Sequence, residues 1–534
     1  MNAVFKVIYN EALKVFQAVN EMTRSRGKRA SSGLGGQTAQ SSGKGFSAHL
    51  SGVAASLVAA GFMGAAPASA AENPLNVVGS ITISGEETYD GIQSEQNDAV
   101  LQIDKGGRLV IQGKGTSTFV ASLKDGSSGG GELILDNSRL KVTDNDGTNF
   151  SGTIRLQNGS EVDVVHLTGL TGTGTGTIVV DDGSKLIGDG RKDSNFHIQV
   201  NAKLSGENGR IVLTQGGGSS IKLSNAANDF RGFFSLKNGS LEWTDGAAKF
   251  FSETETEFTD VNLVASSDVT FKSLKFNGES NINLRNGNTL AIADNKPLTL
   301  SGKTYIYGSG IVNALLTGGG SLLIGDGVNA AAVTLSATGP HTYDGNITVD
   351  SGSSLHVAGD ISSNRGIEVA GTLNMEGDYQ NSSSTITIKD GGKATFNSPN
   401  AVIKVGTLNV ESGGTLNLQG YATTGSLSGS GTIVLGNAFG LTVRYQGNQN
   451  EVLKIGNVFE GNGDLHIHRT KPGKVVFEES SDNSEIGLLT LSGAHIASSN
   501  AGAVLANART TSLKGGSVLT VDQDQKVKKL QLAG

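Results

Sequence analysis

The chain has no cysteine, only 6 prolines and 1 tryptophan among its 534 residues. Without cysteine, no disulfide bond can stabilise the fold, so stability must come from packing and from backbone hydrogen bonds. The scarcity of proline, together with the lack of a Gly-X-Y period, excludes a collagen triple helix. Aromatic residues make up only 5% of the chain. A single tryptophan also provides little of the aromatic surface on which a polysaccharide-cleaving enzyme would stack its substrate.

Glycine, in contrast, is abundant: the chain contains 77 Gly, whereas apolar residues account for only 36%. An ordinary globular chain is richer in apolar residues and poorer in glycine. Apolar residues nevertheless alternate with polar ones almost to the last residue, which argues against a disordered chain. The composition therefore predicts an elongated protein with many turns and a thin, continuous core.

The formal net charge of −7 is distributed unevenly. Residues 1–71 contain seven Lys and Arg against two Glu, a net charge of +5, which leaves −12 for residues 72–534. An acidic body repels phosphate groups, so we do not expect nucleic acid as a partner. The same charge favours solubility.

One phrase recurs along the body of the chain. An aromatic residue is followed two positions later by Gly, then by two alternating apolar residues, a turn with a central Gly, and two further apolar residues. Three copies begin at Phe150, Phe230 and Tyr343, and a looser copy with two extra residues begins at Phe459. Alternation with a period of two is typical of a strand with one buried face, and Gly permits the positive φ of a turn. Because one such unit cannot bury its apolar face alone, the copies are predicted to stack on one another.

From residue 72 onward the pattern predicts short strands separated by Gly-rich turns, and no helix. A second phrase, Gly-x-Gly-Thr-Ile-Val, occurs at residues 174–179 and 429–434. An array of β-sandwiches would also suit short strands, but the absence of long loops favours a β-solenoid whose coils stack in chain order. With about 20–25 residues per coil, the body would contain on the order of 20 coils. Residues 437–449 and Pro472 are predicted to be loops at which the solenoid could be divided.

The first 71 residues are predicted to be an export signal. A basic run at residues 24–29 is followed, after a Ser/Gly-rich stretch, by an Ala-rich apolar core that is too weakly hydrophobic for a convincing membrane span. The small residues that follow suit signal peptidase, so cleavage is predicted after Ala70 or Ala71. The predicted organisation is a signal peptide at 1–71, with its core and cleavage site at 50–71, and a mature body at 72–534.

Residues 1–31 carry a more specific signal. They contain Met1-Asn2, an aromatic and apolar block at residues 5–10, Ala12-Leu13 and the basic run. These features resemble the extended signal peptide region of type V secretion substrates, which are the autotransporters and related large exoproteins of Gram-negative bacteria. The resemblance implies an amphipathic helix ahead of the signal core. The two phrases of the body also resemble the passenger repeats of autotransporter adhesins, which implies an all-β, right-handed parallel β-helix.

The family resemblance implies an exported passenger that mediates attachment or cell–cell aggregation through a repetitive face, without catalysis and without a cofactor. The implied partners are the inner-membrane export machinery, which binds the leader, and then host-surface or bacterial-surface molecules, including further copies of itself. We do not expect the mature chain to span a membrane. A polysaccharide-active β-helix, and a structural stalk or non-functional remnant, remain as alternative functions.

The C-terminal residues depart from the family pattern. Autotransporters end in a transmembrane β-barrel, whereas residues 526–534 are predicted to form one more strand of the solenoid. We therefore expect that the chain is partial or that its translocator is encoded separately. With a translocator, the protein is expected at the cell surface, in the outer membrane or outside the cell; without one, it is expected in the periplasm.

Two motifs suggest metal sites but are incomplete. His466 and His468 alternate along one strand and share a face, but no third ligand can be identified. The acidic run at residues 144–147 resembles a calcium loop but lacks carboxylates at the loop's first and last positions. A solvated strand face and a polar turn are the favoured interpretations, and no metal site is predicted.

Two further motifs suggest catalysis. Residues 126–130 match Gly-x-Ser-x-Gly, but no helix follows to form a nucleophile elbow. Asp181 and Asp182 could act as paired carboxylates of a glycosidase, but Gly183 follows them directly and favours a turn. No catalytic residue is predicted.

Overall fold

The structure is a computed structural model that describes residues 5–10, 15–20 and most of residues 73–533. Within the last range the description omits residues 95–98, 114–115, 120–121, 126–128, 143–149, 165–175, 191–196, 217–219, 244–247, 362–364, 398–401, 438, 479–484, 502, 523 and 525. The chain forms two units, Met1–Ala66 and Pro67–Gly534. The predicted cleavage residues Ala70 and Ala71 lie outside the described residues.

In the first unit, β1 (Phe5–Asn10) and β2 (Val15–Asn20) pair in antiparallel register, with Tyr9 opposite Phe16. These strands stand where the resemblance implied an amphipathic helix. Both segments are rich in aromatic and β-branched residues, which favour extended backbone. A short helix without a packing partner is also costly to nucleate.

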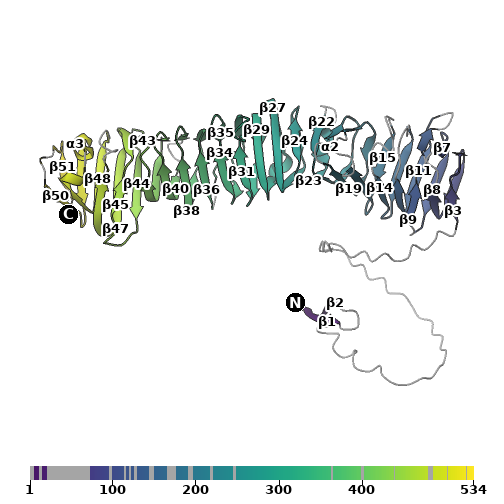
Figure 1. Ribbon diagram of the computed structural model, residues 1–534, viewed down its shortest axis with the longest axis horizontal. Helices are drawn as coiled ribbons and strands as arrows, with labels where there is room; N and C mark the ends of the chain where they lie inside the picture. Colours follow the sequence, from purple (N-terminus) through teal and green to yellow (C-terminus); the bar gives the residue numbers. More distant parts are fainter. Residues whose placement is uncertain are drawn as a thin grey trace, which may run out of the picture. The chain divides into compact units, whose positions relative to one another are not determined.

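The second unit is a parallel β-solenoid of about 17 turns (Figure 1), which confirms the predicted fold. One 13-stranded sheet runs from β3 (Pro74–Asn76) to β33 (Thr342–Tyr343). A 27-stranded sheet runs from β17 (His197–Val200) to β51 (Leu530–Leu532). Paired strands come from successive coils, as β34 (Asn346–Val349) pairs with β36 (Gly366–Val369), so each segment packs on segments close to it in chain order.

The recurring phrase forms a strand, a turn and a second strand in all three full copies. The strand pairs are β13 (Thr153–Gln157) with β14 (Glu161–Val164), β21 (Arg231–Lys237) with β22 (Ser240–Trp243), and β34 (Asn346–Val349) with β35 (Ser354–Val357). The turn glycines Gly159, Gly239 and Gly352 have φ values of 81°, 75° and 76°, a left-handed conformation that glycine adopts without strain.

The aromatic residue explains the glycine two positions after it. Phe150, Phe230 and Tyr343 are fully buried. A Cβ atom on Gly152 or on Gly345 would overlap the preceding aromatic ring and also a carbonyl oxygen of the neighbouring coil. The recurring phrase therefore reflects close packing between coils, because the aromatic ring occupies the space that the glycine leaves open.

In the described part of the solenoid, two short α-helices interrupt the strands, although the sequence predicted none. Helix α2 (Ala248–Glu253) buries Phe250 and Phe251, and α3 (Val504–Asn507) buries Val504 and Leu505. The rings of Phe251 and Trp243 lie 5.4 Å apart, centre to centre, in an edge-to-face arrangement. A helix of six residues is too short to show a period, and its two aromatic side chains fix it by packing in the core.

The predicted loop at residues 437–449 is wrong for residues 440–445 and right for residues 446–449. Within it, β44 (Gly440–Tyr445) pairs in parallel with β42 (Tyr421–Ser428) and β47 (Asp464–Phe477), so the stacking of coils continues there. Pro472 lies inside β47, at a register shift between His468 and Gly473. Proline has no N–H to donate and is accommodated in strands at such bulges.

Candidate functional site

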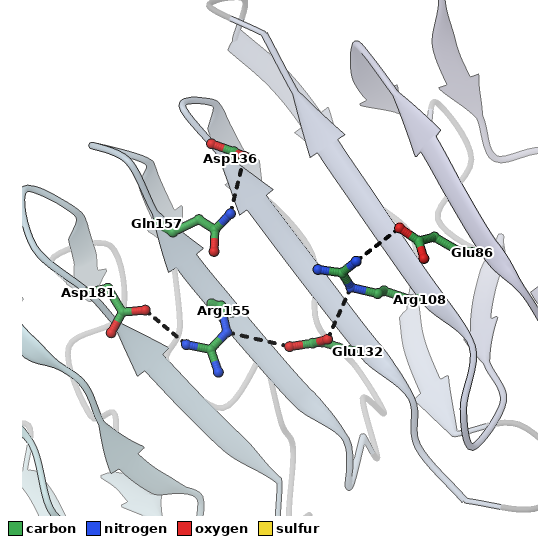
Figure 2. A network of polar contacts seen from close by, with 7 residues as sticks. All are labelled: Glu86, Arg108, Glu132, Asp136, Arg155, Gln157 and Asp181. Carbon is green, nitrogen blue, oxygen red and sulfur yellow. Dashed lines mark hydrogen bonds and ion pairs between the residues drawn. The ribbon is translucent and has the colours of Figure 1, made fainter.

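A network of charged side chains crosses the outward face of the N-terminal coils (Figure 2). It lies on consecutive strands of one sheet, β5 (Glu86–Tyr89), β8 (Arg108–Gln112), β11 (Glu132–Asp136), β13 and β15 (Thr177–Val180), and ends in the turn after β15. Arg108 binds Glu86 at 2.9 Å and Glu132 at 3.4 Å. Acidic and basic groups therefore alternate from one coil to the next.

The network continues through Arg155, which contacts Glu132 at 3.4 Å and Asp181 at 2.9 Å. Beside it, the Gln157 amide donates to Asp136 at 3.1 Å. We call the chain of ion pairs from Glu86 to Asp181 the ionic ladder. Its three carboxylates are engaged by two guanidinium groups, so the ladder links consecutive coils and presents a face on which acidic and basic groups alternate.

The ionic ladder contributes more to the character of the surface than to stability. Its side chains are between 32% and 63% exposed. Exposed ion pairs contribute roughly 0–1 kcal/mol each, because water and salt screen them. The buried apolar core holds the coils together, so the outward residues can vary with little effect on stability.

In the C-terminal half, part of the outward face carries hydroxyl and amide side chains that bond from coil to coil. Ser426 donates to Thr407 at 3.0 Å, and Ser428 donates to Asn409 at 3.0 Å, each from one coil to the preceding one. Asn, Thr and Ser on outward strand positions thus form rows of hydrogen bonds between coils.

The two histidines lie on β47, as their alternation predicted. Nε2 of His466 lies 4.0 Å from the Asp464 carboxylate, and burial lowers the pKa of His466 while Asp464 partly opposes that shift. His468 is exposed. Among the described residues, no three His, Cys, Asp or Glu side chains gather into a metal-binding group.

The other motifs are only partly described. Asp181 and Asp182 lie at a turn in which the Ser184 N–H donates to the Asp181 carbonyl at 2.9 Å, which confirms the turn interpretation. Residues 144–147 lie outside the described residues, and of 126–130 only the last two glycines are described.

The sequence did not reveal the ionic ladder, because its partners are far apart in the chain. Arg108 and Glu86 are 22 residues apart, and Arg155 and Glu132 are 23 residues apart. The sequence feature that could have predicted the ladder is a pair of oppositely charged residues separated by the length of one coil. Arg139 and Glu161, 22 residues apart and joined at 2.8 Å, follow the same rule on the adjacent sheet.

No helix in the described part of the chain has the length and apolar character needed to cross a bilayer. No curated protein and no solved structure was found to match the chain. Residues 1–65 match the family described as the extended signal peptide of the type V secretion system. That signal implies export across the inner membrane of a Gram-negative bacterium. An extended signal peptide of type V secretion followed by a parallel β-solenoid is consistent with an autotransporter passenger.

Proposed function

We propose that the solenoid is a cell-surface adhesin that mediates attachment or cell–cell aggregation through its repetitive outward face. The observation that carries the proposal is the series of polar side chains in strand register across many coils, behind a type V secretion signal. A repeated, rigid row offers a partner the same chemistry at regular intervals, so weak contacts add up across several coils.

The rigidity of the strands supports this function. A binding face built on strands holds its side chains more firmly than a face built on loops, so less entropy is lost when a partner binds. The ionic ladder supplies alternating charge and the C-terminal coils supply hydroxyl and amide groups, which are suited to polar surface molecules and to a second copy of the chain.

The proposal is tested by displaying the full chain, fused at its C-terminus to an outer-membrane translocator, on a non-adherent Gram-negative host. Displaying cells and non-displaying cells carry different fluorescent labels and are mixed, and attachment to cultured host cells is counted in parallel. Clumps of displaying cells alone indicate self-association, whereas mixed clumps or host attachment indicate a different receptor.

The matched control is the same host with the translocator alone at an equal surface level, measured by antibody staining. If displayed chains change neither clumping nor attachment relative to this control, the adhesin proposal is wrong.

A further inference from the structure

A cavity of about 370 Å³ opens on the outward face of the C-terminal half. It lies over β38 (Tyr379–Ile388), β40 (Val402–Val410), β42 and β44. Gly406 and Gly425 line it together with Ser382 and Gln446. A volume of roughly 300–1,000 Å³ is usual for small-ligand sites.

Two basic side chains stand at this cavity, which we call the basic groove. Lys404 lies opposite Thr423, and Thr423 lies opposite Thr442, in adjacent strands. Arg444 follows Thr442 by two residues and therefore points to the same face. Strand spacing and rise place the Cα atoms of Lys404 and Arg444 about 12 Å apart, so the groove can contact an anionic ligand at two points.

The charge of the basic groove is not balanced by the residues that line it. The lining residues are Ser382, Lys404, Val405, Gly406, Thr423, Thr424, Gly425, Arg444 and Gln446, and none of them is acidic. Lys404 and Arg444 are exposed, and neither forms an ion pair within the described part of the chain. By contrast, Lys389 at a nearby corner lies between Glu368 and Glu411, at 3.8 and 3.3 Å.

Two carboxylates on segments next to the strands of the groove have other partners. Asp378 accepts the Val402 N–H at 2.8 Å and the Gln380 amide at 2.7 Å. Glu451 accepts the Tyr445 hydroxyl at 3.2 Å and a backbone N–H at 3.1 Å. Two unneutralised cations in a body with a formal charge of −12 therefore create a local site for an anion.

An exposed aromatic residue flanks the basic groove. Tyr421 is 61% exposed and lies opposite Val402, which is 45% exposed. Tyr421 alternates with Thr423 and so points to the same side of β42. Phe439 packs edge-on against Tyr421, with ring centres 5.7 Å apart, and fixes the orientation of that ring.

We propose that the basic groove binds an acidic carbohydrate, meaning a sugar that carries a carboxylate or a sulfate. The apolar face of a sugar ring packs on Tyr421, while Thr423 and Gln446 bond to its hydroxyl groups. Arg444 binds the anionic group through paired N–H donors, and Lys404 adds a second positive charge. This inference rests on the proposed adhesin function, to which it adds a receptor class.

Binding is measured calorimetrically on the exported protein with three probes: a trisaccharide that ends in sialic acid, a sulfated disaccharide, and neutral lactose. We expect at least one charged probe to bind tenfold or more tightly than lactose, and the preferred probe identifies the anionic group. Lys404→Ala, Arg444→Ala and Tyr421→Ala should each weaken that binding about tenfold. Lys393→Ala, on the exposed side of β39 (Lys393–Phe396), is the matched control and should leave it unchanged.

Several outcomes would overturn the proposal. The proposal is wrong if lactose binds as tightly as the charged probes, or if both Lys404→Ala and Arg444→Ala bind the charged probe as tightly as wild type. It is also wrong if Lys393→Ala weakens binding as much as the groove variants do, or if a single-stranded oligonucleotide binds more tightly than the charged sugars. Circular dichroism of each variant separates loss of binding from loss of folding. If cells that display the Lys404→Ala/Arg444→Ala double variant adhere like wild type, the groove inference fails and the adhesin function stands. If the purified protein binds the charged sugar but displayed cells do not adhere, the adhesin proposal fails and the groove inference stands.

Discussion

Arg469 is a charged residue whose side chain lies inside the solenoid. It is only 2% exposed. Its guanidinium donates to the main-chain carbonyls of Lys474 at 2.8 Å, Asn448 at 2.9 Å and Lys471 at 3.3 Å. The guanidinium carbon also lies 5.1 Å from the centre of the Tyr445 ring. Arg469 thus joins the bulge of β47 to the turn that follows β44 in the preceding coil.

The cost of removing this side chain can be worked out from its contacts. Each hydrogen bond from a charged donor contributes roughly 1.5–3 kcal/mol, and a buried carbonyl left without a donor loses a similar amount. Water will reach part of the site, so we expect Arg469→Ala to destabilise this region by about 3–5 kcal/mol. Arg469→Lys keeps the charge but lacks the planar fork, and should cost about half as much.

The assay is hydrogen exchange measured by mass spectrometry of peptides. Because each coil contacts only its neighbours, the effect should be local. A loss of 3–5 kcal/mol corresponds to a decrease in protection of about 10²- to 10³-fold or more in β44 and the C-terminal half of β47. The N-terminal coils should be unchanged, and so should a control variant, Arg285→Ala, which alters an exposed arginine. Unchanged protection in β44, or an equal loss in every coil, would refute the reasoning.

Three further predictions concern packing, surface charge and pH. Gly345→Ala places a Cβ against the Tyr343 hydroxyl and a backbone oxygen, so it should destabilise the solenoid by about 1–3 kcal/mol in urea unfolding. Arg155→Ala breaks the ionic ladder but should cost no more than about 1 kcal/mol, and the difference should vanish in 1 M salt. Burial lowers the pKa of His341, whose Nδ1 accepts the Leu316 N–H at 2.9 Å. Because the folded state disfavours the protonated ring, this contact should be intact above about pH 6.5 and should weaken as the pH falls below it, measured as faster exchange at the Leu316 amide. His341→Gln should show no such pH dependence.

The strands could be predicted from the sequence because inward positions are apolar and alternate with polar outward positions. In the copy that begins at Tyr343, Ile347 and Val349 alternate with polar residues and are buried as the pattern requires. The strand at residues 440–445 was not predicted, because Asn, Gly and Gln on either side of it are residues typical of loops. The alternation of Leu441 and Val443 inside it was the true strand signal, and both residues are fully buried.

The outward sites could not be predicted in the same way, because coil length varies. Leu355 pairs with Leu373, 18 residues later, whereas Leu186 pairs with Ile211, 25 residues later. A single insertion in a turn shifts every later outward partner, so contacts between coils require the actual register. The lining of the basic groove also includes Gly406 and Gly425, which in the sequence look like ordinary turn glycines.

This division between inward and outward positions bears on how such a protein can change its binding. An inward substitution such as Gly345→Ala disturbs two coils, because the ring and the carbonyl that it meets belong to the packing between them. An outward substitution in the ionic ladder removes an exposed ion pair that contributes little to stability. Exposed rows can therefore shift from ion pairs, as near Arg155, to unpaired cations, as near Arg444, while the core stays constant. Under the proposed function, ligand preference should therefore depend on pairs of exposed residues one or two coils apart, and these pairs can be exchanged without loss of the fold.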